Sequence, residues 1–147
     1  MGKSPLVYIC YQRPASVLDL IQKREPYFND AIRLFSLIEG KQVVGYVSPL
    51  IFANLYYILR KADSKMFAIQ TLVRLKALVR VITIDEKIIE LALSSGFKDF
   101  EDAIQYYAAL GVKLKYLITR NKADYKESGI IVCTAREYLS IRLSTTV

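Results

Sequence analysis

The feature that most constrains the fold is a regular alternation between short apolar runs and longer segments with helical periodicity. The apolar runs are rich in valine, isoleucine and leucine, which favours β-strands. Strands separated by helices are typical of α/β domains with a mainly parallel sheet. We therefore expect a three-layer α/β domain in which helices flank a parallel sheet of five strands, at residues 6–11, 43–47, 79–84, 114–119 and 130–133.

The segments between these runs predict seven helices. Ser48 followed by Pro49 suits a helix start, and Thr134 with Glu137 three residues later forms a capping box. The expected helices cover residues 15–23, 27–39, 49–61, 65–78, 86–95, 100–110 and 135–143.

The chain has 147 residues, so we expect a single domain over residues 1–147. Cys10 and Cys133 lie far apart within apolar runs, which favours buried reduced thiols over a disulfide or a metal pair. The N-terminus lacks a signal-peptide cleavage site, and Pro49 interrupts the uncharged run at residues 42–59. We accordingly expect a cytoplasmic protein that does not associate with a membrane.

The chain contains no histidine, which excludes Ser-His and Cys-His nucleophilic mechanisms and zinc held by histidine. Acid-base or metal chemistry therefore falls to aspartate and glutamate. Asp99 and Asp102 stand three residues apart at a predicted helix start, so both carboxylates face one way and could share a divalent cation. The alternative is an N-cap followed by acids that the helix dipole stabilises.

Three further polar residues fall near the carboxyl ends of predicted strands, where open parallel sheets bind ligands. Asn54 lies within an otherwise apolar helix, where a polar site and a satisfied core amide explain it equally well. Asn121 and Asp124 follow a predicted strand, where such residues also make ordinary turns.

Basic residues outnumber acidic ones by 21 to 14, and the net charge of +7 suits a polyanionic partner. The excess is greatest over residues 60–80, which include Arg60, Lys61 and Lys65. An ordinary solvated helix face explains the same residues, so charge alone leaves both interpretations open.

Three motifs of the chain resemble those of the PIN domain family, in its bacterial branch. They read YVSPLIFANLYYILRK, KDFEDAIQYYAA and LITRNKADY, and they occur in this order with family-like spacing. The resemblance covers residues 19–139 and implies an α/β fold with a parallel sheet. It also implies an endoribonuclease of the VapC toxin type that uses Mg²⁺ or Mn²⁺ to activate a water molecule against a phosphodiester.

The resemblance also assigns roles to individual residues. Asp102 matches the most recognisable family acid, and Asp99 and Asp124 are supporting metal ligands. Asn54 stands where many PIN nucleases have glutamate. The implied catalytic residues are Asp102, Asp99, Asp124, Asn54, Asn121 and Thr119. The cations expected to face RNA are Arg60, Lys61, Lys65, Arg120 and Lys122.

The first family motif is degenerate in this chain. PIN nucleases open with a strand that ends in an aspartate, usually a metal ligand, whereas this chain reads CYQRPASVLDL with Arg13 in that place. A guanidinium there would repel a cation. Codons for the family motif, read one base out of phase, can encode Tyr-Gln-Arg-Pro, so a compensated frameshift and ordinary divergence both explain the change.

Two functions from different classes fit this sequence. The first is a PIN-type ribonuclease, weakened or inactive without its first carboxylate, with RNA as substrate, an antitoxin as protein partner and a homodimer as its assembly. The second is a non-catalytic PIN module that binds RNA or protein. The apolar, tyrosine-rich helix at residues 50–59 suits either a dimer interface or the core.

Overall fold

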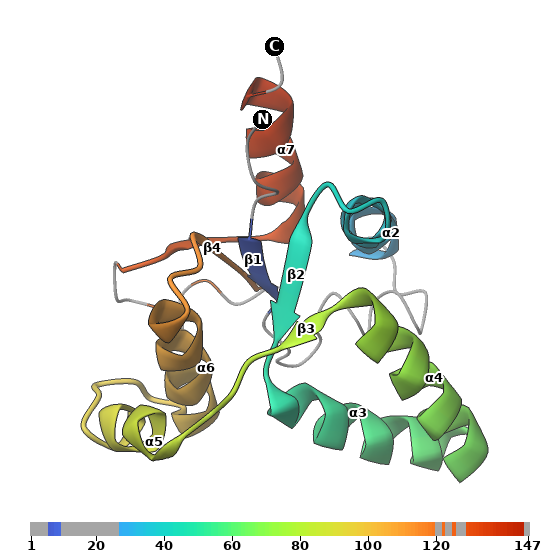
Figure 1. The fold of residues 1–147 in the computed structure, drawn as a ribbon, viewed down its shortest axis with the longest axis horizontal. Coiled ribbons are helices and arrows are strands. Elements are labelled where there is room, and N and C mark those ends of the chain that lie inside the picture. The colour runs from blue at the N-terminus through green and yellow to red at the C-terminus, as the bar shows by residue number, and fades with distance from the viewer. Residues whose placement is uncertain (1–5, 10–26, 120–121, 123–124, 126–128, 146–147) are drawn as a thin grey trace.

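Five short strands form one parallel sheet in the computed structural model, which describes residues 6–9, 27–119, 122, 125 and 129–145 (Figure 1). The strands are β1 (Leu6–Ile9), β2 (Val44–Val47), β3 (Arg80–Val81), β4 (Tyr116–Ile118) and β5 (Ile131–Cys133). Their order across the sheet is β3-β2-β1-β4-β5. The chain first adds β2 and β3 on one side of β1 and then adds β4 and β5 on the other. A topological switch point therefore lies between β1 and β4.

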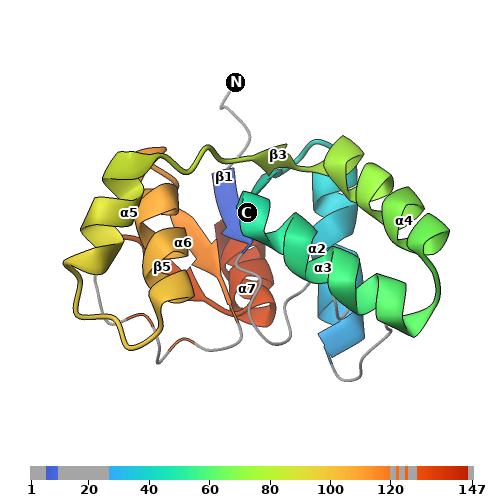
Figure 2. The same ribbon diagram turned by 90° about the horizontal axis from the view of Figure 1, so that it is seen from below.

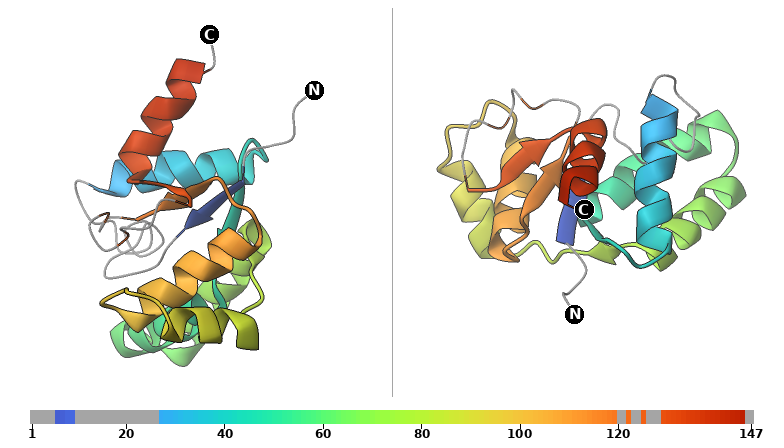
Figure 3. Two further views of the ribbon diagram at one scale, coloured as in Figure 1. Left: turned by 90° about the vertical axis from the view of Figure 1, so that its left-hand side faces the viewer. Right: turned by 90° about the horizontal axis from the view of Figure 1, so that it is seen from above.

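The helices cover both faces of this sheet. On one side lie α2 (Tyr27–Glu39) and α7 (Ala135–Thr145), and on the other lie the remaining described helices (Figure 3). These are α3 (Pro49–Ala62), α4 (Lys65–Leu78), α5 (Glu86–Leu93) and α6 (Phe100–Gly111). The α3 helix begins as its sequence predicts, because the Ser48 hydroxyl accepts the backbone N–H of Leu50 and Pro49 occupies the first turn.

Neighbouring residues of β4 show how the core is divided between the two faces. Leu117 is fully buried in a cluster with Tyr106 and Ala109 of α6. Ile118, whose side chain points to the opposite face, packs into a cluster that contains Tyr138 of α7. The sheet is therefore buried on both sides, as is usual for parallel strands joined by helical crossovers.

The α/β class expected from the sequence is confirmed. The bounds of α2 and α4 are as predicted, and the other described helices end within two residues of their predicted ends. Strands β2 to β5 are shorter than predicted: β3 has two residues because only Arg80 and Val81 pair with β2. The helix predicted at residues 15–23 lies outside the described residues.

Within the part of the chain that the structure describes, none of the helices combines the length and apolar character needed to cross a bilayer.

Candidate active site

The candidate site lies at the carboxyl edge of the sheet, beside the switch point. The chain leaves β2 at Ser48 and β4 at Thr119, and both residues are buried. The α6 helix starts at this same edge because its C-terminus leads to the beginning of β4. Seen from below, α6 and α3 lie on either side of β1 (Figure 2). Ligands of open α/β sheets bind at such an edge.

Asp102 is the acid that the structure places most firmly at this edge. It lies in the first turn of α6 and is only 1% exposed. Its backbone N–H donates to Oδ1 of Asp99, the N-cap of α6, over 3.2 Å. Its own Oδ1 accepts a hydrogen bond of 3.0 Å from the hydroxyl of Tyr125. The N-cap role weighed for Asp99 is therefore observed, and Asp102 is held from two directions.

Asn54 faces the same turn of α6 from α3. Its side-chain amide donates a hydrogen bond of 3.1 Å to Oε1 of Glu101, which lies beside Asp102 in the sequence. Asn54 is half-buried, so its amide is satisfied at the border of the candidate site rather than in the apolar core. The structure thus pairs the side chain of Asn54 with Glu101 and that of Asp102 with Tyr125, and Asp99 caps the turn that carries both acids.

Thr119 is buried where β4 ends. Its backbone N–H donates to the carbonyl oxygen of Cys133 over 3.0 Å and extends the pairing of β4 with β5. The other expected site residues after β4, Arg120, Asn121 and Asp124, lie outside the described residues, as does Arg13.

The donor chemistry of this edge suits a hard divalent cation. Asp99, Glu101 and Asp102 carry carboxylates at this edge and Asn54 carries an amide, and Mg²⁺ is commonly bound by one or two carboxylates together with water. Among the described residues, no three histidine, cysteine, aspartate or glutamate side chains converge on one point. The described residues therefore do not form a cluster of three or more carboxylates by themselves.

The described members of the expected RNA-facing set lie on several elements. Arg60 and Lys61 are exposed in the last turn of α3, and Lys65 is exposed at the first residue of α4. Six residues separate Asn54 from Arg60, which is roughly 9 Å along the helix axis. Lys122 is half-exposed and forms an ion pair of 2.9 Å with Glu137 of α7.

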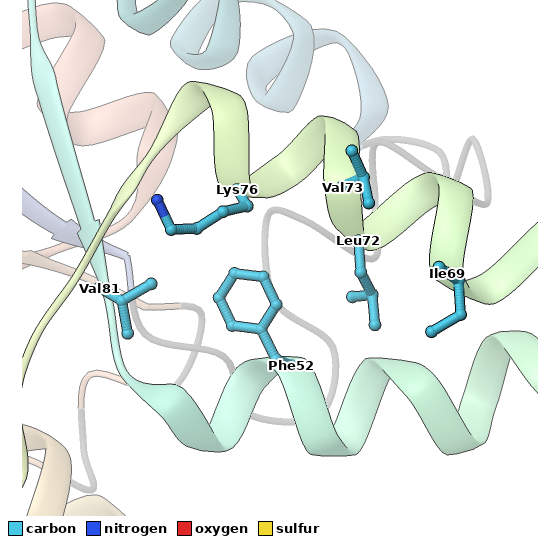
Figure 4. A pocket seen from close by; sticks show the side chains of 6 residues that line it. All are labelled: Phe52, Ile69, Leu72, Val73, Lys76 and Val81. Carbon is cyan, nitrogen blue, oxygen red and sulfur yellow. The ribbon is translucent and has the colours of Figure 1, made fainter.

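A separate apolar hollow of about 390 Å³ lies between α3, α4 and β3 (Figure 4). Lys76 is the one charged side chain in its lining, which consists of Phe52, Ile69, Leu72, Val73, Lys76 and Val81. This lining offers no carboxylate or amide, so the hollow is separate from the candidate site in chemistry as well as in position. Along α3, the side chains of Ile51, Leu55 and Leu59 are buried in the core. Of the two interpretations of this helix, a dimer interface or a part of the core, these three side chains fit the second.

Sequence reasoning missed two residues that contact the candidate site. Glu101 was counted only among the acids at the predicted helix start, yet its carboxylate accepts a hydrogen bond from the Asn54 amide. Tyr125 had no role, although it directly follows Asp124 in the third motif.

Comparison with known proteins gives the class of this fold. A family model described as PIN domain matches residues 15–123. None of the curated protein sequences compared with the chain matches it.

Two solved structures are similar to the chain. VapBC2 from Rickettsia felis, bound to a DNA fragment from its promoter, superposes with a TM-score of 0.61 at 17% identity, over 86% of this chain and 96% of that one. Mycobacterium tuberculosis VapC20, a toxin that cleaves the sarcin-ricin loop, superposes with a TM-score of 0.57 at 16% identity, over 76% and 86%. At such identities the likeness concerns the fold.

The family model matches most of the length of this chain, so the chain belongs to the PIN domain family. The identification made from the three sequence motifs is thereby confirmed.

Proposed function

We propose that this protein is a PIN-type endoribonuclease that depends on Mg²⁺ or Mn²⁺ and acts as the toxin of a toxin-antitoxin pair. The observation that carries the proposal is the buried carboxylate of Asp102 in the first turn of α6, which accepts a hydrogen bond from Tyr125 at the carboxyl edge of the sheet. A buried, oriented acid at this edge suits a functional role better than a stabilising one, because burying a carboxylate costs free energy.

The proposed mechanism is metal-assisted hydrolysis of a phosphodiester. Asp102 is the principal metal ligand, and Asp99 and Asp124 are supporting ligands. A bound divalent cation lowers the pKa of a water molecule and neutralises charge on the phosphate. Asn54, Thr119 and Asn121 orient water or phosphate, and the Asn54–Glu101 hydrogen bond keeps the amide in place.

RNA is the proposed substrate. The net charge of +7 favours a polyanion, and VapC20, similar in fold, is a toxin that cleaves the sarcin-ricin loop. The proposed RNA contacts are Arg60, Lys61, Lys65, Arg120 and Lys122. An antitoxin as protein partner, a homodimer, a cytoplasmic location and a single domain over residues 1–147 complete the proposal.

Loss of the first family acid favours a second candidate function. With Arg13 in place of that aspartate, the chain could be a non-catalytic PIN module that binds RNA or protein. The two functions differ in the effect of Asp102→Asn on RNA affinity. A binding module keeps or gains affinity, because a negative charge near the phosphates disappears.

The test is cleavage of a panel of structured and single-stranded RNAs by the full chain in Mg²⁺, in Mn²⁺ or in EDTA. The proposal predicts cutting in Mg²⁺ or Mn²⁺ and none in EDTA. Retained RNA binding without cutting in any buffer would support the binding module instead.

A further inference from the structure

Tyr125 reaches the carboxylate of Asp102 from the segment between β4 and β5. Its hydroxyl donates to Oδ1 over 3.0 Å, and the two residues are 6% and 1% exposed. A hydrogen bond to a carboxylate away from water is stronger than one at the surface. Tyr125 therefore restrains the orientation of the Asp102 carboxylate.

Aromatic neighbours hold the ring of Tyr125 in turn. Phe97, in the loop before α6, packs edge-on against Tyr125 with ring centroids 6.0 Å apart, and its ring also lies 5.3 Å from that of Tyr106. The Tyr106 hydroxyl accepts a hydrogen bond of 3.0 Å from the backbone N–H of Gly129. The segment between β4 and β5 is thus bonded to α6 at two points. The Tyr125 hydroxyl donates to Asp102, and the Gly129 N–H donates to the Tyr106 hydroxyl.

A carboxylate binds a cation through one oxygen or through two. Ca²⁺ commonly takes both oxygens at longer distances, whereas Mg²⁺ requires near-octahedral geometry around single oxygens. The O–H of Tyr125 directs its positive end at Oδ1 of Asp102, which opposes the approach of a cation to that oxygen as a second ligand atom. The hydrogen bond therefore disfavours two-oxygen binding.

We propose that Tyr125 is a positioning residue that determines which cation the site accepts. Its hydroxyl biases Asp102 toward single-oxygen binding and so favours Mg²⁺ and Mn²⁺ over the larger Ca²⁺. This inference rests on the proposed function, in which Asp102 is a metal ligand. The inference adds to the acidic residues of the proposed site one residue that is not acidic, Tyr125, and assigns to it the choice of cation.

The test is calorimetric titration of the full chain with Mn²⁺ and with Ca²⁺, for the wild type, Tyr125→Phe and Tyr106→Phe. Tyr106→Phe is the matched control, because it also removes a buried tyrosine hydroxyl from the same aromatic group but not one that contacts Asp102. In Tyr125→Phe we expect the ratio of the Ca²⁺ and Mn²⁺ dissociation constants to shift about tenfold toward Ca²⁺, the scale of one charge-assisted hydrogen bond. In Tyr106→Phe the ratio should stay at the wild-type value.

A second substitution keeps the ring and tests the donor itself. With 3-fluorotyrosine at position 125 the hydroxyl becomes a stronger donor, so we expect the ratio to shift away from Ca²⁺. A shift in the same direction as in Tyr125→Phe would contradict the inference.

The outcomes separate this inference from the proposed function. A wild-type chain that binds Mn²⁺ and a Tyr125→Phe variant with the same cation ratio overturn the inference alone. Equal shifts in Tyr125→Phe and Tyr106→Phe also overturn it, since they reflect a general loosening of the aromatic group. A wild-type chain that binds no Mn²⁺ overturns the proposed function and the inference together.

Discussion

The side-chain amide of Asn54 donates a hydrogen bond of 3.1 Å to Oε1 of Glu101, a residue 47 positions later in the chain. This contact joins α3 to the first turn of α6 at the carboxyl edge of the sheet. The family resemblance places glutamate at the position of Asn54 in many PIN nucleases. In this chain a neutral donor meets the carboxylate, so the two side chains attract each other without a cation between them.

Asn54→Asp tests this relationship. It places two carboxylates within contact distance, and we expect the free energy of unfolding to fall by about 1–2 kcal/mol in a chelating buffer, because a hydrogen bond is replaced by repulsion. Urea denaturation measures the change, and Mn²⁺ should restore part of it. Asn54→Ala, which removes the donor without adding charge, should lose less. Equal stability of Asn54→Asp and wild type would show that the contact has no energetic role.

Asp99 and Asp85 form a matched pair of helix caps. Asp99 Oδ1 accepts the backbone N–H of Asp102 at the start of α6, and Asp85 Oδ1 accepts that of Ile88 at the start of α5. Because asparagine is as good an N-cap as aspartate, we expect both Asn variants to keep wild-type melting temperatures. Only Asp99→Asn should weaken Mn²⁺ binding in calorimetric titration. Equal Mn²⁺ affinity in the two variants would show that Asp99 caps α6 but does not bind the cation.

Gly129 is required by a close approach of α6 to the segment before β5. A Cβ atom at this position would lie 2.7 Å from the Tyr106 hydroxyl oxygen and 2.9 Å from Cδ1 of Leu110. We expect Gly129→Ala to lower the free energy of unfolding by about 1–3 kcal/mol through overpacking, measured by urea denaturation. Gly96→Ala is the control, since a Cβ there meets no atom within 4 Å.

A double-mutant cycle assigns this loss to its cause. Tyr106→Phe removes the nearest atom, so the penalty of Gly129→Ala should shrink in that background. An unchanged penalty would place the clash elsewhere.

Local sequence signals predicted the helices better than the contacts between them. The bounds of α4 follow from chain-local features, since its N-cap Ser64 accepts the backbone N–H of Phe67 within one turn. The strand order and the two-residue length of β3 depend on pairing with β2 across the sheet, which no local pattern encodes.

The candidate site shows the same division. The spacing of Asp99 and Asp102 was sufficient to predict a shared helix start. The bonds from Asn54 to Glu101 and from Tyr125 to Asp102 join residues 47 and 23 positions apart, so they depend on how α3, α6 and the β4–β5 segment pack. The residue types of Asn54 and Tyr125 alone did not identify Glu101 and Asp102 as their hydrogen-bond partners.

Cys133 provides a pH-dependent prediction. Burial, together with the nearby charge of Glu137, raises the pKa of its thiol from 9.0 to about 11. At neutral pH the folded chain then holds about a hundredfold less Cys133 thiolate than the unfolded chain. Alkylation by iodoacetamide at pH 8, followed by mass spectrometry of the Cys133 peptide, should be slow in buffer and fast in urea. Equal rates would contradict the burial of this thiol.

The same thiol affects stability in alkali. Between pH 9 and about 11 the unfolded chain loses this proton while the folded chain retains it, so the contribution of Cys133 to stability is complete below pH 9 and declines as the pH rises. We expect the wild type to lose stability over this range relative to Cys133→Ala. A constant difference between the two proteins would contradict the raised pKa.

Asp102→Asn tests whether the Asp102 carboxylate is needed for RNA cleavage, because it keeps the size of a buried side chain and removes its charge. The measurement is the single-turnover rate of RNA cleavage in Mn²⁺ for wild type and variant, with melting temperatures to confirm that both are folded. The account predicts that the wild type cuts RNA and that the variant is about a hundredfold slower or worse, the scale of losing one group that stabilises transition-state charge. A wild-type rate in the folded variant would contradict the role of Asp102 as the principal metal ligand.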